Sequence, residues 1–219
     1  MSQRDTNKFY ADQVVRVAPG QMEFIKKYAG KQILDVAAAT GDYVEALNQE
    51  GYECTGSDLN KEYVAIAKKR NLPVIVADAS NLKLKDNSVD TVILFELLEH
   101  IKDSQDRIAI MKEAKRVARK NVLITTPNSH HVEMLRRCGL TYEHMLEVDH
   151  KVFFTDDQIK SDVEAAFERS DIIPSEQIDN RLFEELFNLN QRKWLRRTFK
   201  FYPYTPKLFF RYYVVGDAS

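Results

Sequence analysis

Cysteine is scarce in this sequence, and apolar runs are short. The chain has two cysteines, Cys54 and Cys138, which cannot form a network of disulfide bonds, so we expect both thiols to be reduced and buried. No apolar run approaches the ~18 residues of a membrane-spanning helix, and no apolar signal core follows the first residues. These absences favour a cytoplasmic protein.

A net charge is nearly absent as well, but the charges are unevenly distributed. The 219 residues carry a formal net charge of −1. From Arg181 to the end of the chain there are eight basic and three acidic residues, so the first 180 residues are acidic. Such a separation can mark a surface that contacts a partner.

Short β-branched runs alternate with amphipathic segments along the chain. This pattern predicts a Rossmann-like α/β fold, with an open, mostly parallel seven-stranded sheet and helices on both faces. The predicted strands are residues 33–37, 52–56, 73–77, 89–95, 122–125, 173–178 and 208–215. The predicted helices include residues 42–49, 61–70, 132–137 and 181–200, one that begins after an N-cap at Thr155, and a lead-in over 7–27 that is broken near Pro19.

Small side chains follow the first predicted strand, in the segment Asp35-Val-Ala-Ala-Ala-Thr-Gly41. Such a turn lets a ligand approach the backbone, and the next helix offers unpaired N–H groups at its start. Asp58 and Asp78 end the next two strands. An acid ~20 residues after a small-residue turn can accept hydrogen bonds from ribose hydroxyls, although Asp58 can also cap a helix. Three carboxylates at one edge favour a cationic or hydroxyl-rich ligand.

Over roughly residues 30–127, this order of residues resembles the class I S-adenosylmethionine-dependent methyltransferases. The resemblance implies S-adenosylmethionine as the cofactor, with the turn at its methionine moiety, Asp58 at the ribose, and Asp78 with the neighbouring amide at the adenine. It assigns to the cofactor Asp35, Ala37, Gly41, Asp58, Leu59, Asp78, Ala79 and Phe95. The family's turn is usually Asp-x-Gly-x-Gly-x-Gly, whereas Ala37 and Ala39 occupy the first two glycine positions here. We expect the extra methyl groups to be tolerated if φ is negative there.

The motif Glu96-Leu-Leu-Glu99-His100 follows the fourth predicted strand. If this segment is helical, Glu96, Glu99 and His100 share one face. Mixed oxygen and nitrogen ligands without thiolate suit Mg²⁺ or Mn²⁺. Methyltransferases that use no metal also carry Glu-His here, where it lines the pocket or caps the helix, and that alternative stays open.

Two later segments add to this motif: Thr126-Pro-Asn, and the stretch Asp149-His150-Lys-Val-Phe-Phe-Thr. Together they resemble the metal-dependent small-RNA terminal 2′-O-methyltransferases. The resemblance implies a metal ion bound by Glu96, Glu99, His100 and His150. A neutral His100 or His150 could take the proton of the acceptor hydroxyl or hold the metal, so these two are also the candidate catalytic residues. The ubiquinone-pathway O-methyltransferases share the Glu-x-x-Glu-His element, so this element does not identify the substrate.

These motifs predict a methyltransferase that acts on a hydroxyl of a small-molecule or glycan-like acceptor. The alternatives are the 3′-terminal ribose of an RNA and, because of the two alanines in the turn, a non-catalytic cofactor-binding protein. We expect a single domain over 1–219, with a helical lead-in (1–29), a cofactor-binding core (30–127) and a substrate-side region (128–219). His130, His131 and His144 lie in that region and are candidates for substrate contact.

The basic C-terminal region is also rich in aromatic residues. Between Gln191 and Tyr213 there are seven basic residues, nine aromatic residues and no acid. This composition suits stacked nucleotides, peripheral contact with a membrane surface, or a helix packed on the sheet. The sequence leaves these three interpretations open.

Overall fold

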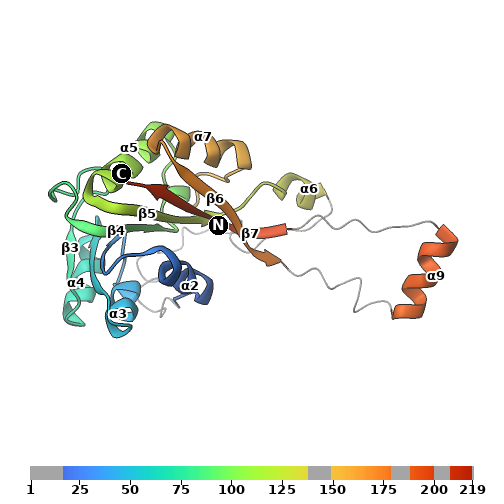
Figure 1. Ribbon diagram of the computed structural model, residues 1–219, viewed down its shortest axis with the longest axis horizontal. Helices are drawn as coiled ribbons and strands as arrows, with labels where there is room; N and C mark the ends of the chain where they lie inside the picture. The colour runs from blue at the N-terminus through green and yellow to red at the C-terminus, as the bar shows by residue number, and fades with distance from the viewer. Residues whose placement is uncertain (1–16, 138–148, 179–187, 200–207, 219) are drawn as a thin grey trace, which may run out of the picture.

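The computed structural model describes residues 17–137, 149–178, 188–199 and 208–218. In these residues seven strands form one sheet, as the sequence predicts, and their order is β3-β2-β1-β4-β5-β7-β6 (Figure 1). Strands β1 to β5 pair in parallel, whereas β7 lies antiparallel between β5 and β6. The strands are β1 (Gln32–Val36), β2 (Glu53–Asp58), β3 (Val74–Val76), β4 (Val89–Phe95), β5 (Ala118–Pro127), β6 (Ser170–Ile178) and β7 (Leu208–Asp217).

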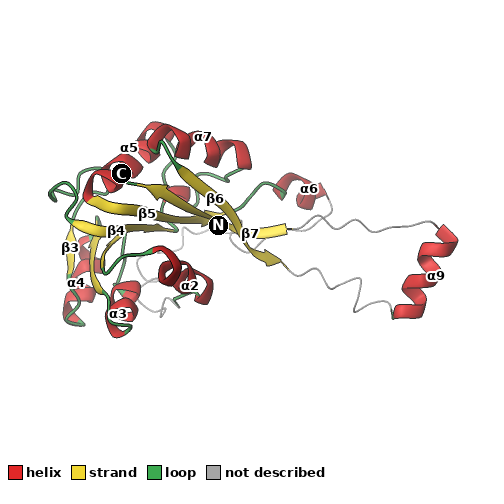
Figure 2. Ribbon diagram, in the orientation of Figure 1, coloured by secondary structure: helices red, strands yellow, loops and turns green. Residues whose placement is uncertain are grey.

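Helices cover both faces of the sheet (Figure 2). One face packs against α2 (Pro19–Tyr28), α3 (Asp42–Gln49) and α4 (Lys61–Lys69), and the other against α5 (Ser104–Val117) and α7 (Asp156–Ala166). The remaining described helices are the 3-10 turn η1 (Leu98–His100), α6 (Val132–Arg137) and α9 (Leu189–Phe199). Thr155 begins α7 with a complete capping box, which confirms the predicted N-cap.

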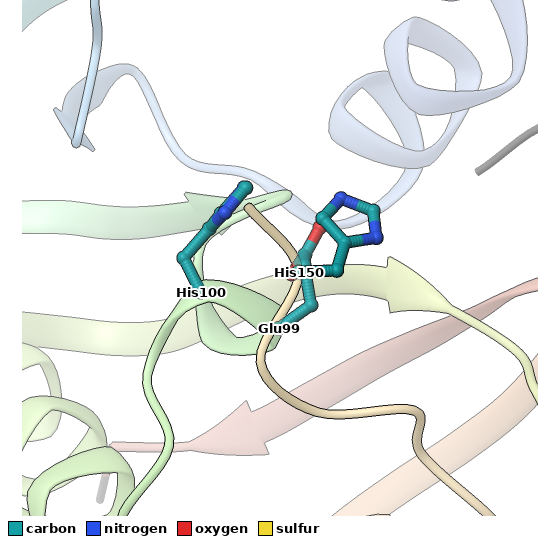
Figure 3. A group of neighbouring side chains, drawn as sticks. All are labelled: Glu99, His100 and His150. Atoms are coloured by element: carbon teal, nitrogen blue, oxygen red, sulfur yellow. The ribbon is translucent and has the colours of Figure 1, made fainter. Parts of the chain in front are cut away.

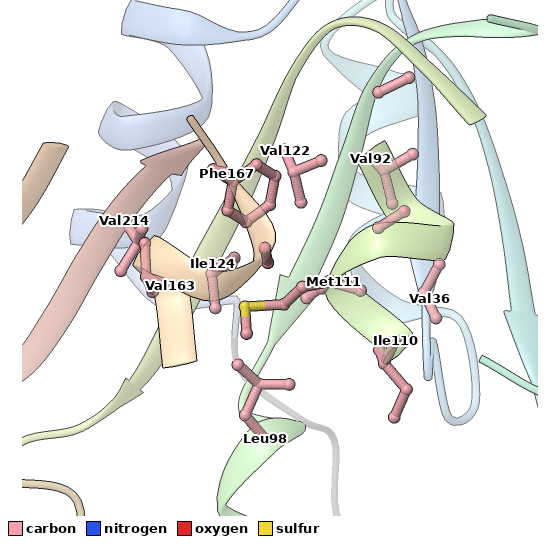
Figure 4. Packing of buried hydrophobic residues seen from close by; sticks show 14 of the residues in the cluster. Val36, Val92, Leu98, Ile110, Met111, Val122, Ile124, Val163, Phe167 and Val214 are labelled. Atoms are coloured by element: carbon pink, nitrogen blue, oxygen red, sulfur yellow. The ribbon is translucent and has the colours of Figure 1, made fainter. Parts of the chain in front are cut away.

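Strand β5 illustrates how the core divides between the two faces. Val122 and Ile124 belong to the cluster that packs against α5 and α7, with Met111 and Phe167 close by (Figure 4). Leu123 belongs to the cluster on the opposite face, with Phe24 of α2. Successive side chains of a strand point to opposite faces, and this alternation continues to the carboxyl end of β5, where it separates two polar clusters.

Some predicted bounds change in the structure. Pro19 begins α2, and Ala18 before it is extended, while the earlier part of the predicted lead-in lies outside the described residues. Cys54 is buried, as expected, whereas Cys138 lies outside the described residues.

Helix α9 lies apart from the sheet in Figure 1. Of the three interpretations of the basic C-terminal region, a helix packed on the sheet therefore does not apply to α9. In the described part of the chain, no helix is long and apolar enough to span a membrane.

Candidate active site at the carboxyl edge of the sheet

The turn after β1 adopts a left-handed backbone at three positions. The φ angles are 62° at Ala37, 45° at Ala39 and 88° at Gly41. The condition under which the extra methyl groups would be tolerated, a negative φ, is therefore not met at Ala37 or Ala39. A left-handed conformation costs an L-residue about 1–2 kcal/mol, so the chain keeps a backbone suited to glycine at an energetic cost. At Gly41 a Cβ atom would also lie 2.8 Å from the Leu72 side chain.

The Asp58 carboxylate stabilises this strained turn from the end of β2. Its Oδ2 accepts a hydrogen bond from the amide of Ala39 at 2.8 Å, and its Oδ1 accepts one from the amide of Asn60 at 2.7 Å. The N-cap of α4 is Asn60, whose side chain accepts from the amide of Glu62, so Asp58 does not cap this helix. Asp58 thus links the turn to the second strand.

Asp35 lies beneath the turn and is 4% exposed. Burial raises the pKa of its carboxyl well above the ordinary value, and the neighbouring Asp58 and Asp42 raise it further. On the outer side of the turn, Arg70 binds the Asp42 carboxylate at 2.6 Å and the carbonyl of Thr40 at 2.9 Å. A cationic ligand at this edge would reduce the repulsion among the carboxylates.

The other predicted cofactor residues lie at the ends of neighbouring strands. Asp78 is exposed, and the Ser80 side chain and amide donate to its Oδ1 and lower the pKa of its carboxyl. Leu59 is 68% exposed, and Ala79 packs against the core. Phe95, at the end of β4, is buried edge-to-face against Tyr43 at a centroid distance of 5.5 Å. The predicted set therefore gathers along one edge.

Three of the four predicted metal ligands form a group beside this edge: Glu99, His100 and His150 (Figure 3). Each offers one ligand atom, and these atoms lie within 4.8 Å of one another. Glu99 is 1% exposed, and its Oε2 accepts a hydrogen bond from the Thr126 hydroxyl at 3.1 Å. We call Glu99, His100 and His150 the metal-ligand group.

The backbone of the η1 turn brings His150 into this group. The amides of Lys151 and Val152 donate to the carbonyl of Glu99 at 2.8 and 3.0 Å. The two imidazole rings meet edge-to-face, with a centroid distance of 4.9 Å. The carbonyl of Asp149 lies 3.3 Å from the Nδ1 of His100. A hydrogen bond to one ring nitrogen orients a histidine so that the other can bind a metal.

Glu96 does not join the metal-ligand group, and the prediction that it lies on one helical face with Glu99 and His100 is corrected. Its φ angle of 50° interrupts the backbone before η1, so the i, i+3, i+4 relationship does not apply. Its Oε1 accepts hydrogen bonds from Thr125 at 2.8 Å and from Arg211 at 3.0 Å. Glu96 is thus oriented toward the face of the sheet that α2 covers.

Residues 34–125 match the family model described as a methyltransferase domain. This part of the chain is a methyltransferase domain. The chain is 32% identical over 96 residues to a demethylmenaquinone methyltransferase of Corynebacterium efficiens, covering 44% of this chain and 40% of that protein. It is 29% identical over 113 residues to the probable tRNA methyltransferase 9B of Bos taurus, covering 51% of this chain and 24% of that protein. The aligned regions span less than half of these relatives.

Solved structures show the same fold. A SAM-dependent methyltransferase from Archaeoglobus fulgidus has a TM-score of 0.62 and 17% identity, with 90% of each chain covered. The magnesium protoporphyrin IX methyltransferase of Synechocystis PCC 6803, solved with bound SAH, has a TM-score of 0.59 and 14% identity, with 98% of this chain and 94% of that chain covered. The family model and this shared fold together confirm the resemblance to class I S-adenosylmethionine-dependent methyltransferases.

A second polar cluster, formed mostly by residues outside the matched region, was not predicted. Arg211 on β7 binds Glu96 at 3.0 Å and also pairs with Glu176 on β6. The Tyr213 hydroxyl donates to Glu176 at 2.5 Å, and Gln21 of α2 donates to Glu96 at 3.2 Å. We call Gln21, Glu96, Glu176, Arg211 and Tyr213 the Arg211 cluster. Arg211 lies 115 residues from Glu96 in sequence, so no local pattern could indicate their contact.

The other histidines proposed to contact substrate lie beyond the metal-ligand group. His130 Nδ1 is 3.3 Å from an Asp156 carboxylate oxygen at the start of α7, and its ring packs edge-to-face against His131. Burial and the neighbouring His130 lower the pKa of His131. His144 lies outside the described residues.

Proposed function

We propose that the protein transfers the methyl group of S-adenosylmethionine to a hydroxyl of a small-molecule or glycan-like acceptor, with a divalent metal ion at the metal-ligand group. The observation that carries this proposal is the convergence of Glu99, His100 and His150 within 4.8 Å, beside the edge where the cofactor residues gather. The relatives named for demethylmenaquinone support a small-molecule acceptor.

The carboxylates of the edge fit the charge of the methyl donor. S-adenosylmethionine carries a positive sulfonium and a positive ammonium group, and Asp35, Asp42 and Asp58 surround the turn that would receive it. Methyl transfer is an in-line attack on the sulfonium carbon, so the protein's main task is to position the two reactants. Asp58 contributes by fixing the turn through the amide of Ala39.

The donor atoms fit a divalent cation, and they narrow its identity. Because Glu96 is bound by Arg211, the remaining set has two imidazoles and one carboxylate. Mg²⁺ prefers oxygen ligands, so this set favours Mn²⁺ over Mg²⁺. A bound metal would lower the pKa of an acceptor hydroxyl. Thr126 holds the Glu99 carboxylate. Because both imidazoles would be metal ligands, the proton of the acceptor hydroxyl would pass to water.

The test combines binding and turnover. Calorimetry of the purified protein should detect S-adenosylmethionine binding, and S-adenosylhomocysteine should form when Mn²⁺ and a metabolite fraction containing the acceptor are added. A chelator should reduce turnover to the level measured without metal. The variant His150→Ala should show this same low turnover even when Mn²⁺ is present. The control Lys68→Ala, an exposed residue in the last turn of α4, should keep normal turnover. Equal turnover with and without metal in the wild type would contradict the metal role.

An RNA 3′-terminal ribose is the second candidate acceptor. It is supported by the relatives named as probable tRNA methyltransferases and by the resemblance of residues 149–155 to the small-RNA enzymes. Labelled methyl groups should then enter an RNA fraction, and oxidation of the terminal ribose with periodate should block the reaction. Cofactor binding without methyl transfer to any fraction would instead support the non-catalytic alternative.

A further inference from the structure

The segment between β6 and β7 is attached at the edge of the sheet where the candidate site lies. Ile178 at the end of β6 pairs with Leu208 at the start of β7. Arg211, three residues later, pairs with Pro127 at the carboxyl end of β5. The chain therefore leaves and re-enters the sheet at the carboxyl edge. Helix α9 is the described part of this segment, and Figure 1 places it beyond that edge.

Helix α9 has a basic and apolar sequence without acids. Its 11 residues, Leu-Asn-Gln-Arg-Lys-Trp-Leu-Arg-Arg-Thr-Phe, include four basic residues. Lys193 and Arg197 are exposed and lie about one helical turn apart, so they occupy one face. The Trp194 side chain is 58% exposed. Basic residues at one set of helical positions and apolar residues at another are typical of helices that lie at a membrane surface.

We propose that α9 binds the surface of a membrane that contains anionic lipids and so holds the carboxyl edge of the sheet close to it. Lys193 and Arg197 supply charge complementarity to the headgroups, and the amphipathic indole of Trp194 suits the boundary between headgroups and acyl chains. A nucleic acid fits α9 less well than a membrane surface does. Proteins that bind single-stranded nucleic acids place aromatic residues along a positively charged groove, whereas the aromatic and basic residues of α9 lie on one short helix. The proposal does not depend on the acceptor or the metal.

The sequence provides its own probe for this contact. Trp194 is the only tryptophan in the chain, so intrinsic tryptophan emission reports on α9 alone. The full-length protein is titrated with vesicles of phosphatidylcholine alone or of phosphatidylcholine and phosphatidylglycerol in equal parts. We expect a shift of the emission to shorter wavelength with the mixed vesicles only. The proposal is wrong if neither vesicle shifts the emission, or if both shift it equally.

Charge removal tests whether α9 itself makes the contact. Each basic residue near an anionic surface strengthens binding about 5-fold, so Lys193→Gln/Arg197→Gln should bind the mixed vesicles about 25-fold more weakly in co-sedimentation. The control Lys68→Gln/Lys69→Gln removes two exposed charges from α4 and should bind normally. Equal losses in both variants, or no loss in the α9 variant, would overturn the proposal.

Two further measurements separate membrane binding by α9 from the proposed methyl transfer and from nucleic-acid binding. S-adenosylmethionine affinity should be the same in all these variants, which shows that they are folded, and vesicle binding should persist even if no acceptor is ever methylated. A single-stranded oligouridylate serves as the competing ligand. If it shifts the Trp194 emission and the mixed vesicles do not, α9 is a nucleic-acid surface and the membrane proposal is refuted.

Discussion

Two polar clusters lie at the carboxyl end of β5, one on each face of the sheet, and their charges are compensated differently. Thr126 contacts Glu99 of the metal-ligand group, whereas its neighbour Thr125 contacts Glu96 of the Arg211 cluster. Consecutive strand residues point to opposite faces, so the two glutamates of one short motif separate. Glu96 is paired with a guanidinium, while Glu99 lies with two imidazoles. The Arg211 cluster therefore suits a structural role, and the metal-ligand group suits the binding of a metal ion.

The largest expected effect distinguishes the two glutamates directly. Glu99→Gln should weaken Mn²⁺ binding by at least ~100-fold, because loss of a ligand should exceed the 10–100-fold cost of losing an outer partner. Glu96→Gln is the matched control. It should change Mn²⁺ affinity by less than about 3-fold, because Glu96 pairs with Arg211 and is not one of the metal-ligand group. Calorimetric titration of both variants with MnCl₂ measures this. Equal losses in the two would restore Glu96 to the ligand set.

The Arg211 cluster should contribute to stability. Arg211→Met leaves the carboxylates of Glu96 and Glu176 without their cation, and we expect a loss of about 2–3 kcal/mol in the free energy of unfolding. Urea denaturation followed by circular dichroism measures it. The control Arg169→Met removes a largely exposed partner of Asp217 and should cost less than about 1 kcal/mol. Similar losses in the two variants would show that the cluster has no special role.

Asp35 differs from Glu96 in having a buried carboxyl whose pKa is raised by burial and by Asp58 and Asp42. A raised pKa means that the folded state binds the proton more tightly than the unfolded chain, so ionised Asp35 opposes folding at neutral pH. Asp35→Asn should therefore raise the melting temperature of the cofactor-free protein. It should also weaken S-adenosylmethionine binding about 10–100-fold, because a charge-assisted contact is lost.

The pH dependence of the melting temperature tests separately whether ionised Asp35 destabilises the folded protein. The melting-temperature difference between Asp35→Asn and the wild type should shrink as the pH falls below the raised pKa, because the wild-type carboxyl is then protonated. Over the same interval, the affinity of the wild type for S-adenosylmethionine should fall. A difference that stays constant down to low pH would show that Asp35 does not titrate in this way.

The smallest expected effect concerns the left-handed turn. Ala39→Gly should relieve about 1–2 kcal/mol of backbone strain and increase the flexibility of the unfolded chain at a cost of about 0.4–1 kcal/mol. The net expectation is a gain of about 0.5–1 kcal/mol in chemical denaturation. Ala46→Gly, inside α3, should instead lose about 1 kcal/mol. A loss at both positions would show that the turn is not strained at Ala39.

Local sequence signals predicted the regular elements well. The predicted bounds 42–49, 89–95 and 132–137 coincide with α3, β4 and α6. The N-cap at Thr155 was also predicted, because a capping box depends on residues only three positions apart. The gathering of Asp35, Asp58 and Asp78 at one edge follows from parallel pairing, which the alternation of strands and helices already implies.

The sequence by itself determined the Rossmann-like architecture, the edge where the cofactor residues lie and three members of the metal-ligand group. Only the tertiary structure decided the position of Glu96, because its partner Arg211 arrives on β7, which enters antiparallel between β5 and β6. The left-handed alanines were likewise decided by the fold, since Asp58 and the next helix fix a turn that alanine does not favour. Periodicity specifies which face a residue occupies within one element, but contacts between distant elements determine which charges meet.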